Sequence, residues 1–596
     1  MKQACRQNKL YTDAILKQFI PILDWLPRYK RSYLKGDIQS GLTVAIMLVP
    51  QGMAYGLLAG LPPIYGLYAS LFSLVLYAIF GTSRELSVGP AAIVSMLVAA
   101  GIFSLGEDLS TAEMVSIAVS IALLAGILQF LLGVFRLGVL VNFLSHPVIA
   151  GFASAAAFII AFSQLKHLLG IPLQRSNNIF VLAGDAIEHI GQLHWITLGI
   201  SVVSIIIIQG LKRISKAIPT ALIVVLFGTL AVVGFDLDQQ GVAVIGKVPE
   251  GLPPFAWPDL SADRILSIWP IAVTICIISF IESVAIAKTM GRQQSSPHID
   301  PNQELIALGI TKIGGAFFQA FPTSGSFSRS AIHVDSGAKT GISSLISALI
   351  IVLTLLFFTE WFYYLPKAVL AAIIISAVIN LVDYKEARHL WSADRRDFWT
   401  MLTTFVATLL LGIQNGVLMG VLLSLAIMVY RNSRPHIAVL GQLPNSRRYR
   451  SISRFSNAQQ HEEVLIVRFD AQLYFGNADY FRDEIERLVA REGRALQLFI
   501  LDASSIHDID TTGAESLGEV IEILQGRNIR FFISGAVGPA RDALSRHGLM
   551  QVIGERNQFI QIHDAVEYYH TAADAADSSW TPDALQTNEP KKKKRK

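Results

Sequence analysis

Residues 321–332, with the sequence FPTSGSFSRSAI, combine hydroxyl side chains, glycine and an arginine between two apolar runs. The preceding run covers residues 306–321 and the following run covers residues 340–358, which places the segment inside an apolar region. A free arginine in lipid is costly. Irregular backbone at that depth must be buried in protein or line a water-filled cavity. The segment is therefore a candidate substrate site.

A second segment has the same character. Residues 81–96 read GTSRELSVGPAAIVSM, in which residues 85–89 are predicted to be extended and Pro90 suits the first turn of a helix. Both segments precede a short span, the third of one set of seven spans and the third of the next, and such a pair indicates an inverted-repeat transporter. The helix N-termini would converge near the membrane midplane. Their exposed N–H groups and dipoles favour an anion.

Two further positions have polar side chains inside predicted spans. In the first span, about residues 37–60, Pro50 interrupts the helix, and Gln51 and Tyr55 lie one turn apart on the same side. The alternative interpretation is a kinked packing helix. In the eighth span, Glu282 has apolar neighbours on both sides. An ionisable group there is functional by default, and the alternative is a structural acid paired with Lys288 or Lys312.

The composition identifies the class of protein. The chain has 596 residues, of which 52% are hydrophobic and only 16% charged, and its mean hydropathy is +0.48. Apolar windows of about 17–25 residues, the span of a bilayer, recur from about residue 41 to residue 430, and the remainder is predicted to be soluble. Cys5 and Cys276 have no ligand-spaced neighbours, so the sequence predicts neither a disulfide framework, a metal site nor a cofactor.

The distribution of basic residues predicts the topology. A basic cluster at residues 28–35 precedes the first span and places the N-terminus in the cytoplasm. The predicted outer loops at residues 106–113 and 235–264 contain more acidic than basic residues. An even number of spans, predicted to be fourteen, returns the chain to the cytoplasm. The predicted inner loops carry Arg136, Lys212, Arg213, Lys216, Lys288, Arg292, Lys385, Arg388, Arg395 and Arg396.

The soluble part alternates strand-like and helix-like segments. Residues 464–469, 495–501 and 529–533 are predicted strands, and Asn477 is a predicted cap of a helix over residues 480–491. This order predicts a small α/β domain with a partly parallel sheet. The basic end, residues 591–596, is predicted to be a solvated tail, with binding to anionic lipid or a targeting role as alternatives.

Two long motifs carry a family resemblance. Residues 49–68, VPQGMAYGLLAGLPPIYGLY, together with GTSRELSVGP, resemble the SulP (solute carrier 26-like) anion transporters, and residues 501–513, LDASSIHDIDTTG, resemble a STAS-domain loop. The resemblance implies a polytopic α-helical membrane protein with 14 spans in a 7+7 inverted repeat, divided into core and gate subdomains, plus a cytoplasmic α/β STAS domain. It also implies a homodimer with elevator-like alternating access. The expected divisions are a cytoplasmic segment (1–36), a transporter domain (37–434), a linker (435–460), the STAS domain (461–572) and a disordered tail (573–596).

The resemblance also assigns residues to roles. Glu282 matches the position of a proton- or sodium-coupling carboxylate; because it is Glu instead of Asp, and Ile286 replaces the sodium-site hydroxyl, a proton is favoured. In the STAS loop, Thr511 or Thr512 is a possible regulatory phosphorylation site, with helix capping as the alternative. The implied anion-binding residues are Gln51, Tyr55, Val88, Gly89, Ala91, Ser326, Phe327, Ser328 and Arg329.

The sequence therefore predicts proton-coupled sulfate uptake through the inner (plasma) membrane, with both termini cytoplasmic. The expected partners are a small inorganic anion, protons, membrane lipid, a second copy of the chain and cytoplasmic proteins that bind the STAS domain, but no nucleic acid. A bicarbonate or C4-dicarboxylate transporter, and an uncoupled anion channel, exchanger or voltage-responsive motor, are the alternatives. An enzyme is disfavoured because the spans show no nucleophile–base pair or metal-spaced cluster, and His146, His167 and His194 lie near predicted span ends.

Overall fold

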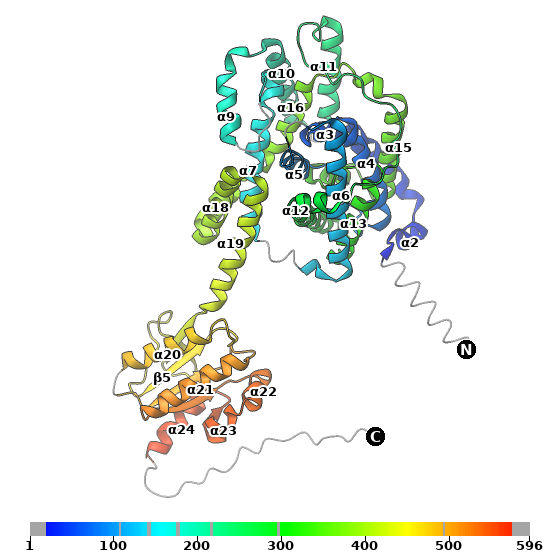
Figure 1. The fold of residues 1–596 in the computed structure, drawn as a ribbon. Coiled ribbons are helices and arrows are strands. Elements are labelled where there is room, and N and C mark those ends of the chain that lie inside the picture. The colour runs from blue at the N-terminus through cyan, green and yellow to red at the C-terminus, as the bar shows by residue number, and fades with distance from the viewer. Residues whose placement is uncertain are drawn as a thin grey trace, which may run out of the picture. The chain divides into compact units, whose positions relative to one another are not determined.

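The computed structural model describes residues 19–106, 109–139, 145–173, 179–214, 219–294, 299–492 and 495–574. The chain divides into two compact units, Met1–Ser424 and Leu425–Lys596, shown in Figure 1 from blue to red along the chain. The basic end at residues 591–596 and Cys5 lie outside the described residues. The boundary between the two units falls within helix α19 (Ile413–Ser433).

The first unit is almost entirely helical (Figure 1). In the described residues, five helical stretches are long and apolar enough to cross a membrane, and further apolar helices of 10–17 residues accompany them. The number of spans, fourteen, stays a prediction. The helices are α2 (Ile22–Trp25), α3 (Leu34–Leu58), α4 (Ile64–Phe80), α5 (Ala92–Phe103), α6 (Thr111–Val134), α7 (His146–Ser163), α8 (Leu165–Leu169), α9 (Ile179–Glu188), α10 (Trp195–Ile214), α11 (Thr220–Phe235), α12 (Ala262–Gln294), α13 (Pro301–Ala316), α14 (Phe327–Asp335), α15 (Ile342–Phe357), α16 (Lys367–Val378), α17 (Tyr384–Ala393), α18 (Arg395–Leu411) and α19 (Ile413–Ser433).

Two very short strands lie within this helical unit. Strand β1 (Val88–Gly89) pairs antiparallel with β2 (Ser324–Gly325), with Val88 opposite Gly325 and Gly89 opposite Ser324. Each strand comes just before a short helix, α5 after β1 and α14 after β2. The two interrupted segments, although far apart in the sequence, therefore lie side by side. The sequence predicted Pro90 in the first turn of a helix. In the structure Pro90 instead precedes Ala91, the N-cap of α5.

Close helix packing supports this pair of strands. Helices α3 and α4 approach so closely that a Cβ at Gly66 would overlap the Gly52 carbonyl oxygen. Helix α6 packs against α13, where a Cβ at Gly126 would lie 2.9 Å from the Gly309 carbonyl oxygen. Because only glycine permits such approaches without displacement of backbone, these contacts fix the spacing of the helices around β1 and β2.

The second unit is an α/β domain with a six-stranded sheet in the order β4-β3-β5-β6-β7-β8. Strands β5 to β8 run parallel, and β3 pairs antiparallel with both β4 and β5. The elements are β3 (Ile437–Gln442), β4 (Tyr449–Ser451), β5 (Val464–Phe469), α20 (Ala478–Glu492), β6 (Leu498–Asp502), α21 (Thr511–Gly526), β7 (Arg530–Ser534), α22 (Gly538–Arg546), α23 (Leu549–Ile553), β8 (Gln558–Phe559) and α24 (Ile562–Asp574).

Both faces of the sheet are covered. Alternate residues of the central strands point to opposite faces. Val467 and Leu501 therefore pack on one side in a core that includes α20 and α21, whereas Ile466 and Ile500 pack on the other side with α24. Residues 435–460, which the sequence assigns to a linker, contain β3 and β4. Both strands belong to the sheet, and β3 hydrogen-bonds to β5.

The start of α21 corrects one sequence interpretation. Asp510 is the N-cap, and its carboxylate accepts hydrogen bonds from the backbone N–H groups of Gly513 (2.8 Å) and Phe475 (2.9 Å). The interpretation that Thr511 or Thr512 caps this helix is therefore wrong. Both threonines occupy the first turn with exposed side chains. Their phosphorylation stays a prediction.

Candidate functional site

Arg329, in the first turn of α14, is fully buried, with an exposed fraction of 0%. Its Nη1 donates to the Pro90 carbonyl oxygen at 2.7 Å and lies 3.5 Å from Gln51 Oε1. In the described part of the chain, Nε and Nη2 of this guanidinium have no hydrogen-bond partner. A buried donor without a partner costs about 1–3 kcal/mol, and more when it is charged. An anionic ligand would satisfy these two donors.

The guanidinium of Arg329 joins the two interrupted segments. A Cβ at Gly89 would lie 3.2 Å from Arg329 Nη2, so the charged group lies directly against the backbone of β1. The Ser326 N–H donates to the Ser87 carbonyl at 3.2 Å, and the Ser87 N–H donates to Ser330 Oγ at 2.9 Å. These cross-connections hold the start of α14 beside β1, whose chain continues into α5.

Helix N-termini supply further donors at this place. The N-caps are Ala91 for α5 and Ser326 for α14, and neither side chain satisfies the first N–H groups of its helix. Such groups have no partner within the helix and carry the positive end of its dipole. Two helix starts joined by an antiparallel strand pair, with a buried arginine against them, make a region of positive potential.

Helix α3 contributes Gln51 and Tyr55, both buried. Gln51 Nε2 donates to the Tyr55 hydroxyl oxygen at 3.0 Å, while its Oε1 faces Arg329. Because Tyr55 accepts this bond, its own hydroxyl hydrogen can still donate to a ligand. The site therefore combines a charged donor, a phenol donor and backbone N–H groups, which is the donor set that binds oxyanions.

The structure brings most of the predicted anion-binding residues together and separates two. Val88, Gly89, Ala91 and Ser326 are buried at the β1–β2 pair. Phe327 and Ser328, by contrast, have exposed side chains. Any role of these two in the site is therefore through their backbone N–H groups in the first turn of α14.

Glu282, on α12, lies next to the same strand pair. It is half-buried, and its Oε2 accepts a hydrogen bond from Ser324 Oγ at 2.8 Å. The next residue, Ser283, accepts from the Gly325 N–H at 2.9 Å, so α12 holds β2 from its other side. Lys288 is exposed.

Helices α6, α12 and α13 share a buried polar network near Glu282 that was not predicted from the sequence. Lys312 Nζ, on α13, donates to Gln129 Oε1 of α6 at 2.9 Å. Gln129 Nε2 in turn donates to Ser279 Oγ of α12 at 2.9 Å, and Ser324 Oγ lies 3.3 Å from the Ser279 carbonyl oxygen. The sequence named Lys312 only as a possible partner of Glu282. The available signal for Gln129 was an amide inside a long apolar run.

Comparison with known proteins identifies the family. The model of the sulfate permease family matches residues 34–404. The chain belongs to the sulfate permease family. The STAS domain model matches residues 456–567. Members of this family are transporters, so the enzyme alternative does not apply. The resemblance to SulP transporters with a STAS domain is confirmed.

Two plant relatives match over almost the whole of this sulfate permease. Sulfate transporter 4.1, chloroplastic, of Arabidopsis thaliana is 40% identical over 92% of this chain and 82% of its own length. Probable sulfate transporter 4.2 of the same plant is 38% identical over 96% of this chain and 86% of its own length. Both relatives are therefore named as transporters of sulfate.

A solved structure matches both units of this sulfate permease. The murine Solute Carrier 26 family member A9 anion transporter in the inward-facing state is 26% identical, covers 94% of this chain and 95% of its own, and has a TM-score of 0.87. The predicted fold class, a helical membrane transporter with an α/β STAS domain, is confirmed. In the described residues, no group of three or more His, Cys, Asp or Glu side chains could hold a metal ion.

Proposed function

We propose that this sulfate permease is a secondary active transporter that takes up sulfate together with protons by alternating access. The observation that carries the proposal is the Arg329 guanidinium, buried between the starts of α5 and α14 with Nε and Nη2 unpaired among the described residues. The names of the plant relatives favour sulfate among the possible oxyanions. A tetrahedral dianion would satisfy the arginine and the helix N–H groups together.

The anion is held between the two half-helices. Arg329 supplies charge and two N–H donors, and Tyr55 supplies its hydroxyl while Gln51 orients it. The backbone from Val88 to Ala91 and the N–H groups of residues 327 and 328, in the first turn of α14, complete the pocket. Because these groups come from both repeats, movement of α3 relative to the β1–β2 pair would open the pocket to one side or the other.

Glu282 is the proposed proton-carrying group. Its carboxylate accepts from Ser324, whose backbone pairs with Gly89 beside the anion, so its protonation changes a bond to the substrate-binding strand pair. Uptake of a dianion against the membrane potential costs about 2.3 kcal/mol per charge per 100 mV. Co-entry of protons offsets that cost. The glutamate at this position and Ile286 one turn later support a proton as the coupling ion instead of sodium.

The coupling is tested by uptake of radiolabelled sulfate into proteoliposomes with imposed pH or sodium gradients. We expect an inward proton gradient to accelerate uptake by about tenfold or more and a sodium gradient to have no effect. In the Glu282→Gln variant the proton response should vanish, while the matched Glu360→Gln variant, at an exposed position, should behave as the wild type. Uptake that ignores the pH gradient, or a Glu282→Gln variant that still follows it, would refute the coupling.

The substrate and the transport mode have their own test. A competition panel of sulfate, bicarbonate and C4-dicarboxylates should show sulfate as the strongest inhibitor of labelled sulfate uptake. Preference for one of the others would establish the alternative substrate. Macroscopic uncoupled anion current would establish a channel or motor.

The remaining assignments are also proposals. The transporter lies in the inner (plasma) membrane with both termini cytoplasmic and works as a homodimer. Residues 37–434 form the transporter domain and residues 461–572 form the STAS domain, to which the strands β3 and β4 are added here. Cysteine cross-linking of the intact protein in its native membrane measures the oligomeric state, and accessibility labelling of an introduced terminal tag measures the topology.

A further inference from the structure

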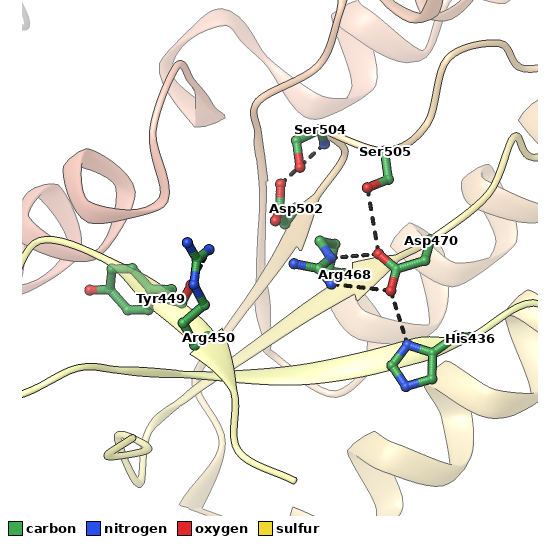
Figure 2. A network of polar contacts seen from close by, with 8 residues as sticks. All are labelled: His436, Tyr449, Arg450, Arg468, Asp470, Asp502, Ser504 and Ser505. Atoms are coloured by element: carbon green, nitrogen blue, oxygen red, sulfur yellow. Dashed lines mark hydrogen bonds and ion pairs between the residues drawn. The ribbon is translucent and has the colours of Figure 1, made fainter. Parts of the chain in front are cut away.

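The second unit contains a basic cavity that the transport function does not use. The cavity has a volume of about 200 Å³ and lies where β3 begins and β5 ends, beside β4 (Figure 2). That volume holds several water molecules at about 30 Å³ each, which is enough for a hydrated inorganic anion. The lining residues are His436, Arg450, Ser451, Arg454, Phe455, Arg468 and Asp470.

The one acidic side chain lining the cavity is already engaged. Arg468 donates to both carboxylate oxygens of Asp470 through Nε and Nη2, His436 Nδ1 lies 2.9 Å from Asp470 Oδ2, and Ser505 Oγ lies 3.5 Å from Oδ1 (Figure 2). Burial disfavours the charge of Asp470, but these hydrogen bonds outweigh it and lower its pKa. The carboxylate therefore stays ionised and fixes the orientation of the Arg468 guanidinium and the His436 ring.

Two arginines on the other side of the cavity have no carboxylate partner in the described residues. Arg450 makes one long contact, from Nη1 to the Tyr449 carbonyl oxygen at 3.5 Å, and both Arg450 and Arg454 are exposed. Asp502, on β6, acts on the charge of Arg468 but does not line the cavity, and it accepts from the Ser504 N–H. Three arginines and one carboxylate therefore line this small cavity. The cavity has an excess of two positive charges.

We propose that this cavity binds a tetrahedral oxyanion of the sulfate and phosphate class as a dianion. Arg450 and Arg454 hold two of its oxygens, and the guanidinium that Asp470 orients completes the site. The planar forks of arginine match such oxyanions. The excess charge equals that of the dianion, and the volume is too small for a folded peptide segment.

The oxyanion has two possible sources that share this chemistry. It is either a free inorganic ion, including the sulfate that the transporter carries, or a phosphate group on a lipid headgroup. Bound to a free ion, the site would make the second unit a sensor of oxyanion concentration. This inference does not depend on the proposed transport site.

The test is hydrogen–deuterium exchange of the full-length purified protein with added sodium sulfate or inorganic phosphate. Sodium chloride at equal ionic strength is the control. We expect sulfate or phosphate to slow exchange at least threefold in peptides covering residues 436–442 and 448–456, and chloride to have no effect. Exchange of the β5 peptide, residues 464–469, reports folding. Because the readout is local, binding at the transport site does not interfere with it.

Two double variants and two lipid compositions complete the experiment. An Arg450→Ala/Arg454→Ala variant should lose the protection while the β5 peptide stays as in the wild type, and Arg541→Ala/Arg546→Ala, at exposed positions of α22, should keep it. In nanodiscs, protection by phosphatidylinositol 4-phosphate beyond phosphatidylcholine would identify a headgroup as the source, and protection by the free ions would identify those. No protection by any of these probes, or equal protection in the Arg450→Ala/Arg454→Ala variant, would overturn the proposal.

Discussion

Arg329 shows how a single residue can be arranged for a ligand at the expense of the unliganded protein. Its charge is fully buried, one nitrogen is tied to Pro90, and the other two have no partner in the described structure. An uncompensated charge of this kind destabilises a protein unless something pairs with it. In the proposed site the anion is that partner, so we expect substrate binding also to stabilise the fold.

Replacement of Arg329 tests whether the anion compensates its buried charge. In an Arg329→Ala variant we expect uptake of every tested anion to fall at least tenfold, because a charged hydrogen bond contributes about 1.5–3 kcal/mol and each 1.4 kcal/mol is a factor of ten. Sulfate should raise the Tm of the wild type by mass action but leave that of the variant unchanged. Arg213→Ala, at an exposed position on α10, serves as the control. Unchanged affinity in Arg329→Ala would mean that the anion binds elsewhere.

Lys312 is the second buried cation near the site, and its role is different. Its Nζ donates to Gln129 Oε1, and Gln129 in turn donates to Ser279, whose carbonyl lies 3.3 Å from Ser324 Oγ. Lys312 therefore connects α13 and α6 to the strand pair that contacts Glu282.

The charged residues of the site could be predicted from the sequence, whereas several uncharged polar residues could not. Arg329 and Glu282 stand out because each is ionisable inside an apolar stretch, and ionisable groups there are rare. Ser279, Ser324 and Gln129 carry no such mark. Their importance comes from hydrogen bonds across 45 and 150 positions of sequence, which depend on how α6, α12 and β2 pack.

At the scale of elements, the β1–β2 pair is the feature that joins the two interrupted segments. It brings two chain segments together at the starts of α5 and α14, and α12 supports it through Ser283. The sequence predicted two matching interrupted spans from their polar residues and glycines. It did not predict that they form strand hydrogen bonds with each other, because two-residue strands have no periodicity to detect.

Gly325 is the position at which this arrangement is most easily disturbed. A Cβ there would lie 2.8 Å from Leu86 Cδ1 and 3.1 Å from the Ser283 backbone. A Gly325→Ala variant should therefore push β2 away from α12, which we expect to lower sulfate affinity at least tenfold and to lower the Tm by several degrees. Radiolabelled uptake and thermal unfolding measure the two effects.

The matched control is Gly210→Ala on α10, where a Cβ would have nothing within 4 Å among the described residues. Alanine is the better helix former by about 1 kcal/mol, so this variant should be as stable as the wild type or more so, with unchanged transport. If Gly325→Ala retained the affinity of the wild type, the spacing between β2 and α12 would not control the anion site.

At the scale of the whole molecule, composition alone separates a membrane unit from a soluble one, because the apolar windows end near residue 430. The position of the boundary is harder to predict. Strand β3 has the sequence IAVLGQ and is followed by a polar turn with two arginines and by the three-residue β4, a pattern that is typical of a linker. Only the pairing of β3 with β5, and the burial of Leu440 and Tyr449 against α24, show that they belong to the domain.

This boundary predicts how fragments of the chain behave. A fragment of residues 435–574 contains the whole sheet and the cores on both of its faces. We expect it to be soluble and to unfold in one cooperative transition, followed by circular dichroism during heating.

A fragment of residues 461–574, which begins at the sequence-predicted boundary, lacks β3 and β4. It would expose the backbone edge of β5 along the four residue pairs that join β3 to β5, and an open edge invites pairing with another chain. It would also lose Ala438, Leu440 and Tyr449 from the α24 side of the core. We therefore expect this shorter fragment to aggregate or to melt well below the longer one. Equal solubility and equal Tm for the two fragments would show that β3 and β4 are an appendage, and that the domain begins where the sequence alone placed it.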